Sequence, residues 1–331
     1  MTATPTTLPV NSKMSSRSLT KTASTGFLSA TTSLKFTQVM CTAFSIGMLF
    51  FPLKMMEGYK ADTFSGSSQV MFCWAMGIFG TQQLLVGIIS AAIKRDGVPT
   101  AAKSVACLCN AVMWIFFAIN DLSYVLAGAL PESMPADSIY ANCGVLALFG
   151  AISFAGWKAS GSVTPNFGAF HPQGRTQVPL LVAIANLLFF GVALAFFASD
   201  FMELQAPGVL SSLPGAMVKV KGKMVPAGPT EGPLPIILLI LGNAGKCMLA
   251  NCLSTLAICS VADEDTSYRL LRGWCLLQFF FLGTFARDGV LLVATGWPSP
   301  MRLFTFVQCF GVAFYMTDKM VGMPYKLTTK I

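Results

Sequence analysis

The chain carries very little charge for its length. Only 11% of its 331 residues are Asp, Glu, Lys or Arg, whereas 54% are hydrophobic and the mean hydropathy is +0.66. Soluble domains carry about 25% charged residues, so the composition argues against an ordinary soluble globular protein. The net charge of +8 comes from scattered basic residues and not from a clustered stripe. This scatter argues against nucleic acid as a partner.

Histidine is almost absent, because His171 is the only one. A single histidine excludes multi-histidine metal centres and bis-histidine haem ligation, and the sequence has no nucleophile-elbow motif for a Ser-His-acid triad. We therefore predict no catalytic residue, no metal site and no enzyme activity. The ten cysteines form no Cys-x-x-Cys pair and lie in apolar segments. They are predicted to be reduced packing residues and not disulfide partners.

Long apolar runs take the place of the missing charge. A helix needs roughly 20 apolar residues to cross a bilayer, and eight segments come near that length without the polar stripe of a soluble amphipathic helix. The sequence predicts an all-α, polytopic membrane protein with about eight transmembrane helices. The predicted spans are 36–53, 69–93, 104–120, 139–157, 178–199, 235–260, 270–293 and 303–322.

Four blocks of residues occur twice in the same order, which predicts a parallel tandem duplication of a four-helix unit. The second copies follow the first by 146, 165, 167 and 161 residues, pairing Phe50 with Phe196, Gly77 with Gly242, Asp121 with Asp288 and Phe149 with Phe310. We expect a tail at 1–35, a first repeat at 36–160 and a second repeat at 178–322. The second repeat has a longer loop, 200–233, in which alternating Val and Lys at 218–225 predict a small β-hairpin.

The ends of the chain suggest a location and an orientation. Residues 1–35 are rich in Ser and Thr and contain no acid, which is typical of an organellar transit peptide; the alternative is a disordered cytosolic tail. We expect a plastid or mitochondrial membrane. If both termini lie on one side, that side holds 14 of the 22 Lys and Arg residues and the other side holds seven. The positive-inside rule then places both termini on the cytosol-equivalent side.

Lys246 is the one charge deep inside a predicted span. A lysine in mid-bilayer costs a few kcal/mol, so it is a functional candidate by default; the alternative is that it snorkels to the interface. Asn243, Asn251 and Gln82 place amides in the spans, which either join helices by hydrogen bonds or line a polar path. These four residues are the candidates for binding a substrate or ligand.

Acidic residues recur at matching helix ends of the two predicted copies. Glu57 and Glu203 follow the first helix of each copy, and Asp121 and Asp288 end the third. All four are expected on the face opposite the termini, as a vestibule or a contact for a partner. The alternative is that these carboxylates cap helix ends and loop amides.

Two functions of different class fit this sequence. The first is an accessory subunit of a larger organellar membrane complex, in contact with membrane lipid and other subunits and holding lipid or pigment in its grooves. The 27 Phe and 18 Met residues would supply adaptable apolar contacts. The second is a secondary transporter or channel for a small, anionic solute, since transporters built from repeats bind substrate at the repeat interface.

Overall fold

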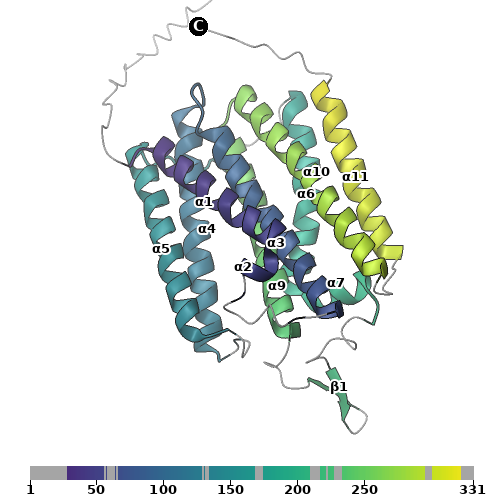
Figure 1. Cartoon of the computed structure of the whole chain (residues 1–331). Coiled ribbons are helices and arrows are strands. Elements are labelled where there is room, and N and C mark those ends of the chain that lie inside the picture. Colours follow the sequence, from purple (N-terminus) through teal and green to yellow (C-terminus); the bar gives the residue numbers. More distant parts are fainter. Residues whose placement is uncertain are drawn as a thin grey trace, which may run out of the picture.

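A computed structural model describes residues 28–55, 57, 64, 66–128, 130, 134–167, 174–208, 217–220, 223–226, 233–294 and 300–321. Long helices that run side by side dominate it (Figure 1). They are α1 (Ala30–Phe50), α3 (Gly66–Ile93), α4 (Thr100–Leu126), α5 (Ala136–Ala159), α6 (Gly174–Phe196), α9 (Pro233–Cys259), α10 (Glu264–Ala294) and α11 (Pro300–Val321). Two short helices, α2 (Pro52–Met55) and α7 (Ala198–Gln205), follow α1 and α6.

A small hairpin lies at one end of the helix bundle. Strand β1 (Met217–Val220) pairs antiparallel with β2 (Lys223–Pro226), so that Met217 faces Pro226 and Val220 faces Lys223. The hairpin predicted from the alternating Val and Lys residues is confirmed. Figure 1 shows it at the end opposite the start of α1 and the end of α11.

Six of the helices are long and apolar enough to cross a membrane, namely α1, α3, α4, α5, α6 and α9. A 27-residue helix such as α4 is about 40 Å long, which exceeds the roughly 30 Å of a bilayer core. Each of the eight predicted spans overlaps one long helix. The crossings by α10 and α11 stay predictions, as does the tandem duplication.

The first helix begins earlier than predicted. It starts at Ala30 because the Ser29 hydroxyl accepts the backbone N–H of Thr32 at 3.1 Å, which is a typical N-cap. Ser33 and Leu34 are already fully buried in the bundle. Helix α1 therefore includes residues that were assigned to the tail at 1–35. The Ser and Thr residues there resemble a disordered tail in composition, although one of them, Ser29, is the N-cap of α1.

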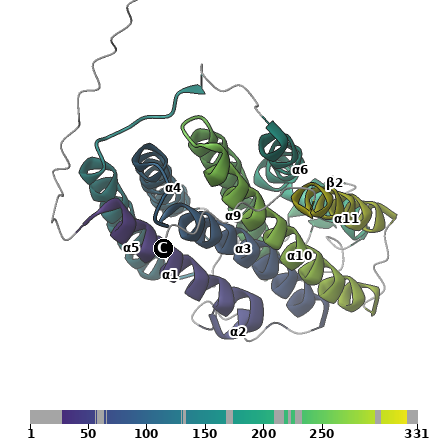
Figure 2. The ribbon, with the colours of Figure 1, turned by 90° about the horizontal axis from the view of Figure 1, so that it is seen from above.

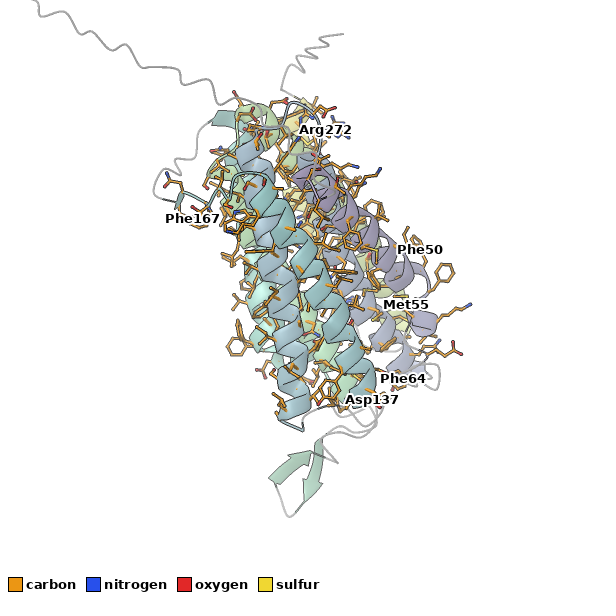
Figure 3. The ribbon with its side chains drawn as sticks, turned by 90° about the vertical axis from the view of Figure 1, so that its left-hand side faces the viewer. Phe50, Met55, Phe64, Asp137, Phe167 and Arg272 are labelled. Carbon is orange, nitrogen blue, oxygen red and sulfur yellow. The ribbon has the colours of Figure 1, made fainter. Side chains whose placement is uncertain are left out.

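The outer faces of the bundle are apolar. Large side chains project outward from α4, α6 and α11, and Phe189 and Phe314 are 60% and 68% exposed. In Figure 3, Phe50 also points away from the bundle. A soluble monomer rarely exposes so large an apolar area, whereas acyl chains would cover it. The fold is that of an integral membrane protein.

The helices are arranged about a central pair, α3 and α9. Viewed from above, α1 and α6 lie on opposite sides of this pair, and so do α4 and α10, while α5 and α11 are outermost (Figure 2). Helix α3 packs against α1, α9 and α10, and α9 packs against α6, α3 and α4. Helix α5 contacts α4 and α1, and α11 contacts α10 and α6.

Two helix ends share one unusual backbone conformation. Helix α1 ends at Phe51, with φ −133° and ψ 45°, whose N–H donates to Gly47 O. Helix α6 ends at Phe197, with φ −133° and ψ 37°, whose N–H donates to Ala193 O. A proline follows Phe51 and explains that break. No proline follows Phe197, so the second break has another cause.

Glycines set the closest helix crossings. A Cβ on Gly245 would lie 2.7 Å from Leu194 C and 2.8 Å from Gly191 O, so the α9 and α6 backbones touch there. A Cβ on Gly80 would lie 2.8 Å from Met48 Cβ, where α3 crosses α1. Nothing lies within 4 Å of the same position on Gly242. Glycines therefore let α9 approach α6 at Gly245 and α3 approach α1 at Gly80.

We predict that Gly245→Ala destabilises the protein, because its methyl group would overlap backbone atoms of α6. Overpacking of this kind costs about 1–3 kcal/mol. Gly242→Ala is the matched control, since its methyl group meets open space and alanine favours the helix by up to about 1 kcal/mol. Thermal unfolding in detergent measures both. A Gly245→Ala protein as stable as the control would contradict the crossing.

Candidate binding cavity

A cavity of about 260 Å³ lies between the helices of the first half of the chain and α9. We call it the inter-half cavity. Its walls come from α1, α2, α3, α4, α5 and α9, and Leu130 and Met134 line it on the connection between α4 and α5. Most lining side chains are Phe, Met, Trp, Leu, Ile or Val. The polar lining residues are Gln83, Asp121, Tyr124, Asn142 and Asn243.

Hydrogen bonds join these polar residues into one wall across three helices. Asn142 on α5 donates to Asp121 Oδ2 on α4 at 2.8 Å. Asn120 donates from Nδ2 to Asp121 Oδ1 at 3.4 Å and to Asn243 Oδ1 on α9 at 3.1 Å. Amides thus surround the Asp121 carboxylate inside an otherwise apolar region. Such a network is costly to break, because water cannot replace the lost hydrogen bonds.

Lys246 contacts this polar wall on the side that faces away from the cavity. Its ammonium group donates a short hydrogen bond to Asn120 Oδ1 and a longer one, 3.4 Å, to the Tyr124 hydroxyl. It also lies 5.3 Å from the centre of the Tyr124 ring. Lys246 is the 14th of the 27 residues of α9, so it sits at mid-helix. It contacts the lining residues and is not itself part of the lining.

Two polar atoms in the cavity have no hydrogen-bond partner among the described residues. They are the indole N–H of Trp114 and Gln83 Oε1. Both side chains line the cavity and are almost fully buried, with 3% and 5% of their surface exposed. A buried donor and a buried acceptor without partners cost free energy unless something binds them. Both atoms are themselves covered by neighbouring side chains, so an occupant of the cavity would bind them only after a lining side chain moves.

The other two ligand candidates form a separate contact. Asn251 on α9 donates to the backbone O of Gln82 on α3 at 3.1 Å and to its Oε1 at 3.4 Å. Both residues are buried at the centre of the bundle, and neither lines the inter-half cavity. The two residues therefore form a hydrogen bond that joins the two central helices, α3 and α9.

The three predicted acids whose side chains the structure describes have different surroundings. Asp121 lines the cavity, whereas Glu57 is exposed beyond α2. Glu203 accepts the backbone N–H of Gly208 at 2.6 Å, which is a capping role. Asp288 belongs to α10, but its side chain lies outside the described part of the structure. A shared vestibule stays a prediction.

Several wall residues were not expected from the sequence. Asn120, Tyr124 and Asn142 were not among the candidates, and Trp114 looked like an ordinary apolar residue. A signal did exist, because Asn120 and Tyr124 are four residues apart and share one face of an otherwise apolar helix. That spacing marks the face that meets Lys246.

No family model matches the chain, and no curated protein or solved structure matches it either. The chemistry of the cavity therefore carries the functional interpretation.

We predict that Asn120 and Lys246 are energetically coupled. Asn120→Leu and Lys246→Met should each destabilise the protein by about 1–3 kcal/mol, because each strands a buried polar partner. The double variant should be less destabilised than the sum, with a coupling free energy above about 0.5 kcal/mol. Unfolding of the four proteins in detergent measures this. Ile119→Ala is the control, since Ile119 is 61% exposed on the same helix; additive effects would contradict the contact.

Proposed function

We propose that the chain is a non-enzymatic membrane transporter that binds a small solute in the inter-half cavity. The observation that carries this proposal is the joint position of the polar wall and the two unpartnered atoms of Trp114 and Gln83. They line a largely apolar cavity between the first half of the chain and α9. In transporters built from repeats, the substrate site commonly lies at the interface of the repeats near mid-membrane.

We propose further that the two halves arose by tandem duplication and that all eight long helices cross the membrane. The matching breaks at Phe51 and Phe197 support this, because they are 146 residues apart, like the first repeated block. Lys158 lies 5.5 Å from the ring of Phe154, and Lys319 lies 5.6 Å from the ring of Tyr315, 161 residues later. Exposed Phe279 and Phe314 give α10 and α11 lipid-compatible faces.

The chemistry of the cavity indicates the class of solute. Its walls favour an apolar body, while Trp114 requires an acceptor and Gln83 a donor. Asp121 is the charged lining residue, and the ammonium of Lys246 is engaged by Asn120 and Tyr124. The geometry therefore favours a small molecule with an apolar body and a polar end that both donates and accepts, such as a hydroxyl. An anionic solute is less well matched than the sequence suggested.

The two halves differ where the proposed site lies. With the offset of 165 residues, Lys246 corresponds to Thr81, whose hydroxyl donates to the backbone O of Gly77 in its own helix. Thr81 therefore does not form a hydrogen bond to another described helix like the one that Lys246 forms to Asn120. Because only α9 contributes a lysine to the wall, we propose one binding position per chain and not two. The proposed transport involves no chemical change of the solute.

The second candidate is the accessory subunit of an organellar complex. It is favoured by the outer face of α5, where Ala147 and Ala151 are exposed and nothing lies within 4 Å of a Cβ on Gly144. These residues face outward from the described part of the bundle, and small outward residues allow a neighbouring subunit to approach closely in lipid. Purification in mild detergent separates the candidates, because a subunit brings stoichiometric partners and a transporter does not.

We predict that filling the cavity abolishes transport. Leu146→Phe adds volume at a lining position, and Leu148→Phe makes the same change two residues later, where the side chain is 57% exposed. Uptake of small solutes is compared in cells that lack the protein and are complemented with each variant. Leu148→Phe should behave like the unchanged protein.

Asp121→Asn should lower uptake of the same solutes about tenfold, because a hydrogen bond to a charged group contributes roughly 1.5–3 kcal/mol. Asp137→Asn, at an exposed position in the first turn of α5, is its control. Uptake that is unchanged in both Leu146→Phe and Asp121→Asn would refute the transport proposal.

We also propose that the protein resides in an organellar membrane with both termini on the cytosol-equivalent side. The acid-free composition of residues 1–35 and the excess of Lys and Arg on one side support this. We predict that a protein tagged at its C-terminus co-fractionates with plastids or mitochondria and lacks N-terminal residues that precede the N-cap Ser29 of α1. A full-length protein in the plasma membrane fraction would contradict it.

A further inference from the structure

A long groove runs along the outer side of α10, away from the inter-half cavity. Two adjoining hollows of about 490 and 460 Å³ form it and share Leu276 and Phe279. The first hollow lies against α3 and Met320 of α11, and the second reaches the end of α1 at Phe50. We call the two together the α10 groove.

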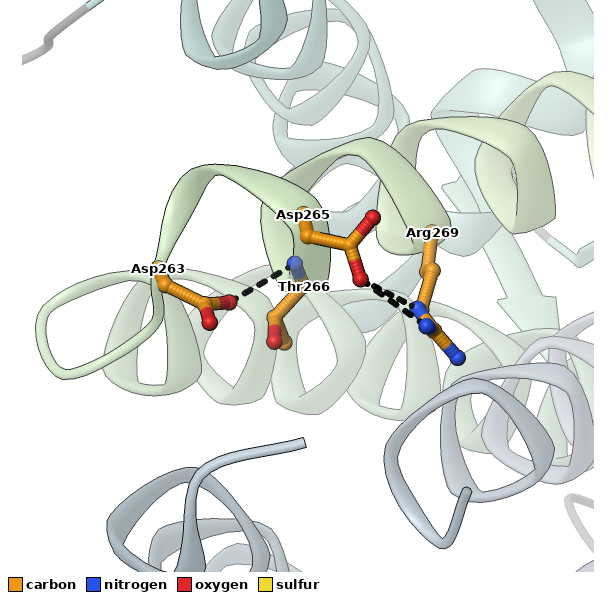
Figure 4. A network of polar contacts seen from close by, with 4 residues as sticks. All are labelled: Asp263, Asp265, Thr266 and Arg269. Carbon is orange, nitrogen blue, oxygen red and sulfur yellow. Dashed lines mark hydrogen bonds and ion pairs between the residues drawn. The ribbon is translucent and has the colours of Figure 1, made fainter. Parts of the chain in front are cut away.

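One end of the α10 groove is cationic. Arg95, at the end of α3, and Arg269 and Arg272, in the first turns of α10, line the first hollow, and no described lining residue is acidic. Figure 3 shows Arg272 at the end of the bundle opposite the hairpin. Arg269 is held in place by Asp265, with bonds of 2.8 and 3.0 Å, as Figure 4 shows. Three guanidinium groups thus line a hollow whose described lining holds no carboxylate.

Beyond the three arginines, mainly apolar side chains line the groove, with Thr284 and Arg287 at its far end. Leu276, Phe279 and Phe280 are 43–52% exposed along it. Its floor is made by the close crossing of α10 on α3, where a Cβ on Gly273 would lie 2.6 Å from Ile88 Cγ2. A chain of apolar atoms could therefore lie between the two helices while its charged end stays at the interface.

We infer that the α10 groove is a binding site for an anionic phospholipid. The headgroup phosphate binds Arg95, Arg269 and Arg272, and an acyl chain runs along Leu276 and Phe279. Basic pockets at the ends of transmembrane helices attract anionic headgroups, and arginine matches phosphate geometry with paired N–H donors. This inference does not depend on the proposed transport.

On the opposite side of the bundle, the chain itself lies over the corresponding helix ends. There, the connection from α5 to α6 lies over the ends of α4 and α9. Val163 N donates to Ser104 Oγ at 3.0 Å, and Asn166 N donates to Ser260 Oγ at 3.1 Å. Ser260 follows Arg95 by 165 residues, the offset of the second repeated block. Arg95 thus lies in the open α10 groove, whereas Ser260, at the corresponding position of the second half, binds the connection that covers it.

Binding is tested with the purified full-length protein in mixed micelles that contain either phosphatidylglycerol or phosphatidylcholine. We expect saturable binding of phosphatidylglycerol that is seen by native mass spectrometry and raises the unfolding temperature. Replacing Arg269 and Arg272 by Gln should weaken this binding about thirtyfold, since each basic residue near a membrane surface contributes roughly 1 kcal/mol. Replacing Lys103 and Lys158 by Gln removes equal charge from the same end of the bundle outside the groove and should change it less than twofold.

Three further results would overturn the inference. Equal binding of the two lipids would show that the site does not recognise the charge of the headgroup. An equal rise of the unfolding temperature with inorganic phosphate alone would assign the arginines to a free anion. Increased phosphatidylglycerol binding after removal of residues 322–331 would show that the chain itself occupies the groove. The unfolding temperature of the arginine variant in phosphatidylcholine checks that it is folded.

Discussion

The backbone contact between α9 and α6 at Gly245 is the constraint on which the rest of the site depends. Because Gly245 has no side chain, the two helices touch there, and the rotation of α9 about its axis is fixed. Lys246 is the next residue, so it must point about 100° away, toward α4. Asn243 lies three residues before Lys246 and shares its face. The packing of Gly245 against α6 thereby directs the side chains of Lys246 and Asn243 toward Asn120.

The apolar surroundings make this small set of polar contacts decisive. In lipid, the helices gain little from burying apolar surface against one another, so close packing and hydrogen bonds determine how they associate. The chain from Asn142 through Asp121 and Asn120 to Asn243 and Lys246 joins α5, α4 and α9. It holds the first half of the chain against the second and forms one wall of the inter-half cavity. Stability and the proposed solute binding would therefore depend on the same residues.

The sequence predicted the membrane class and the position of every long helix, because apolar runs of bilayer length have few alternatives. It also identified Lys246, Asn243 and Asp121 as unusual residues. It could not bring them together, since the contact depends on the rotation of α9 and on Asn120, an ordinary amide in an apolar run. The packing of α5 was not predicted either: it uses Gly150 and Gly156, whose missing side chains admit Ile115 and Ser33, whereas Ala147 and Ala151 face outward.

An experimental density map of the protein in a lipid nanodisc tests the central claim most directly. The account predicts non-protein density in the inter-half cavity, within hydrogen-bond distance of Trp114 Nε1 and Gln83 Oε1, with Lys246 bound to Asn120 behind the wall. A cavity closed by its own side chains, with Lys246 turned toward the membrane surface and Asn120 bonded elsewhere, would contradict it.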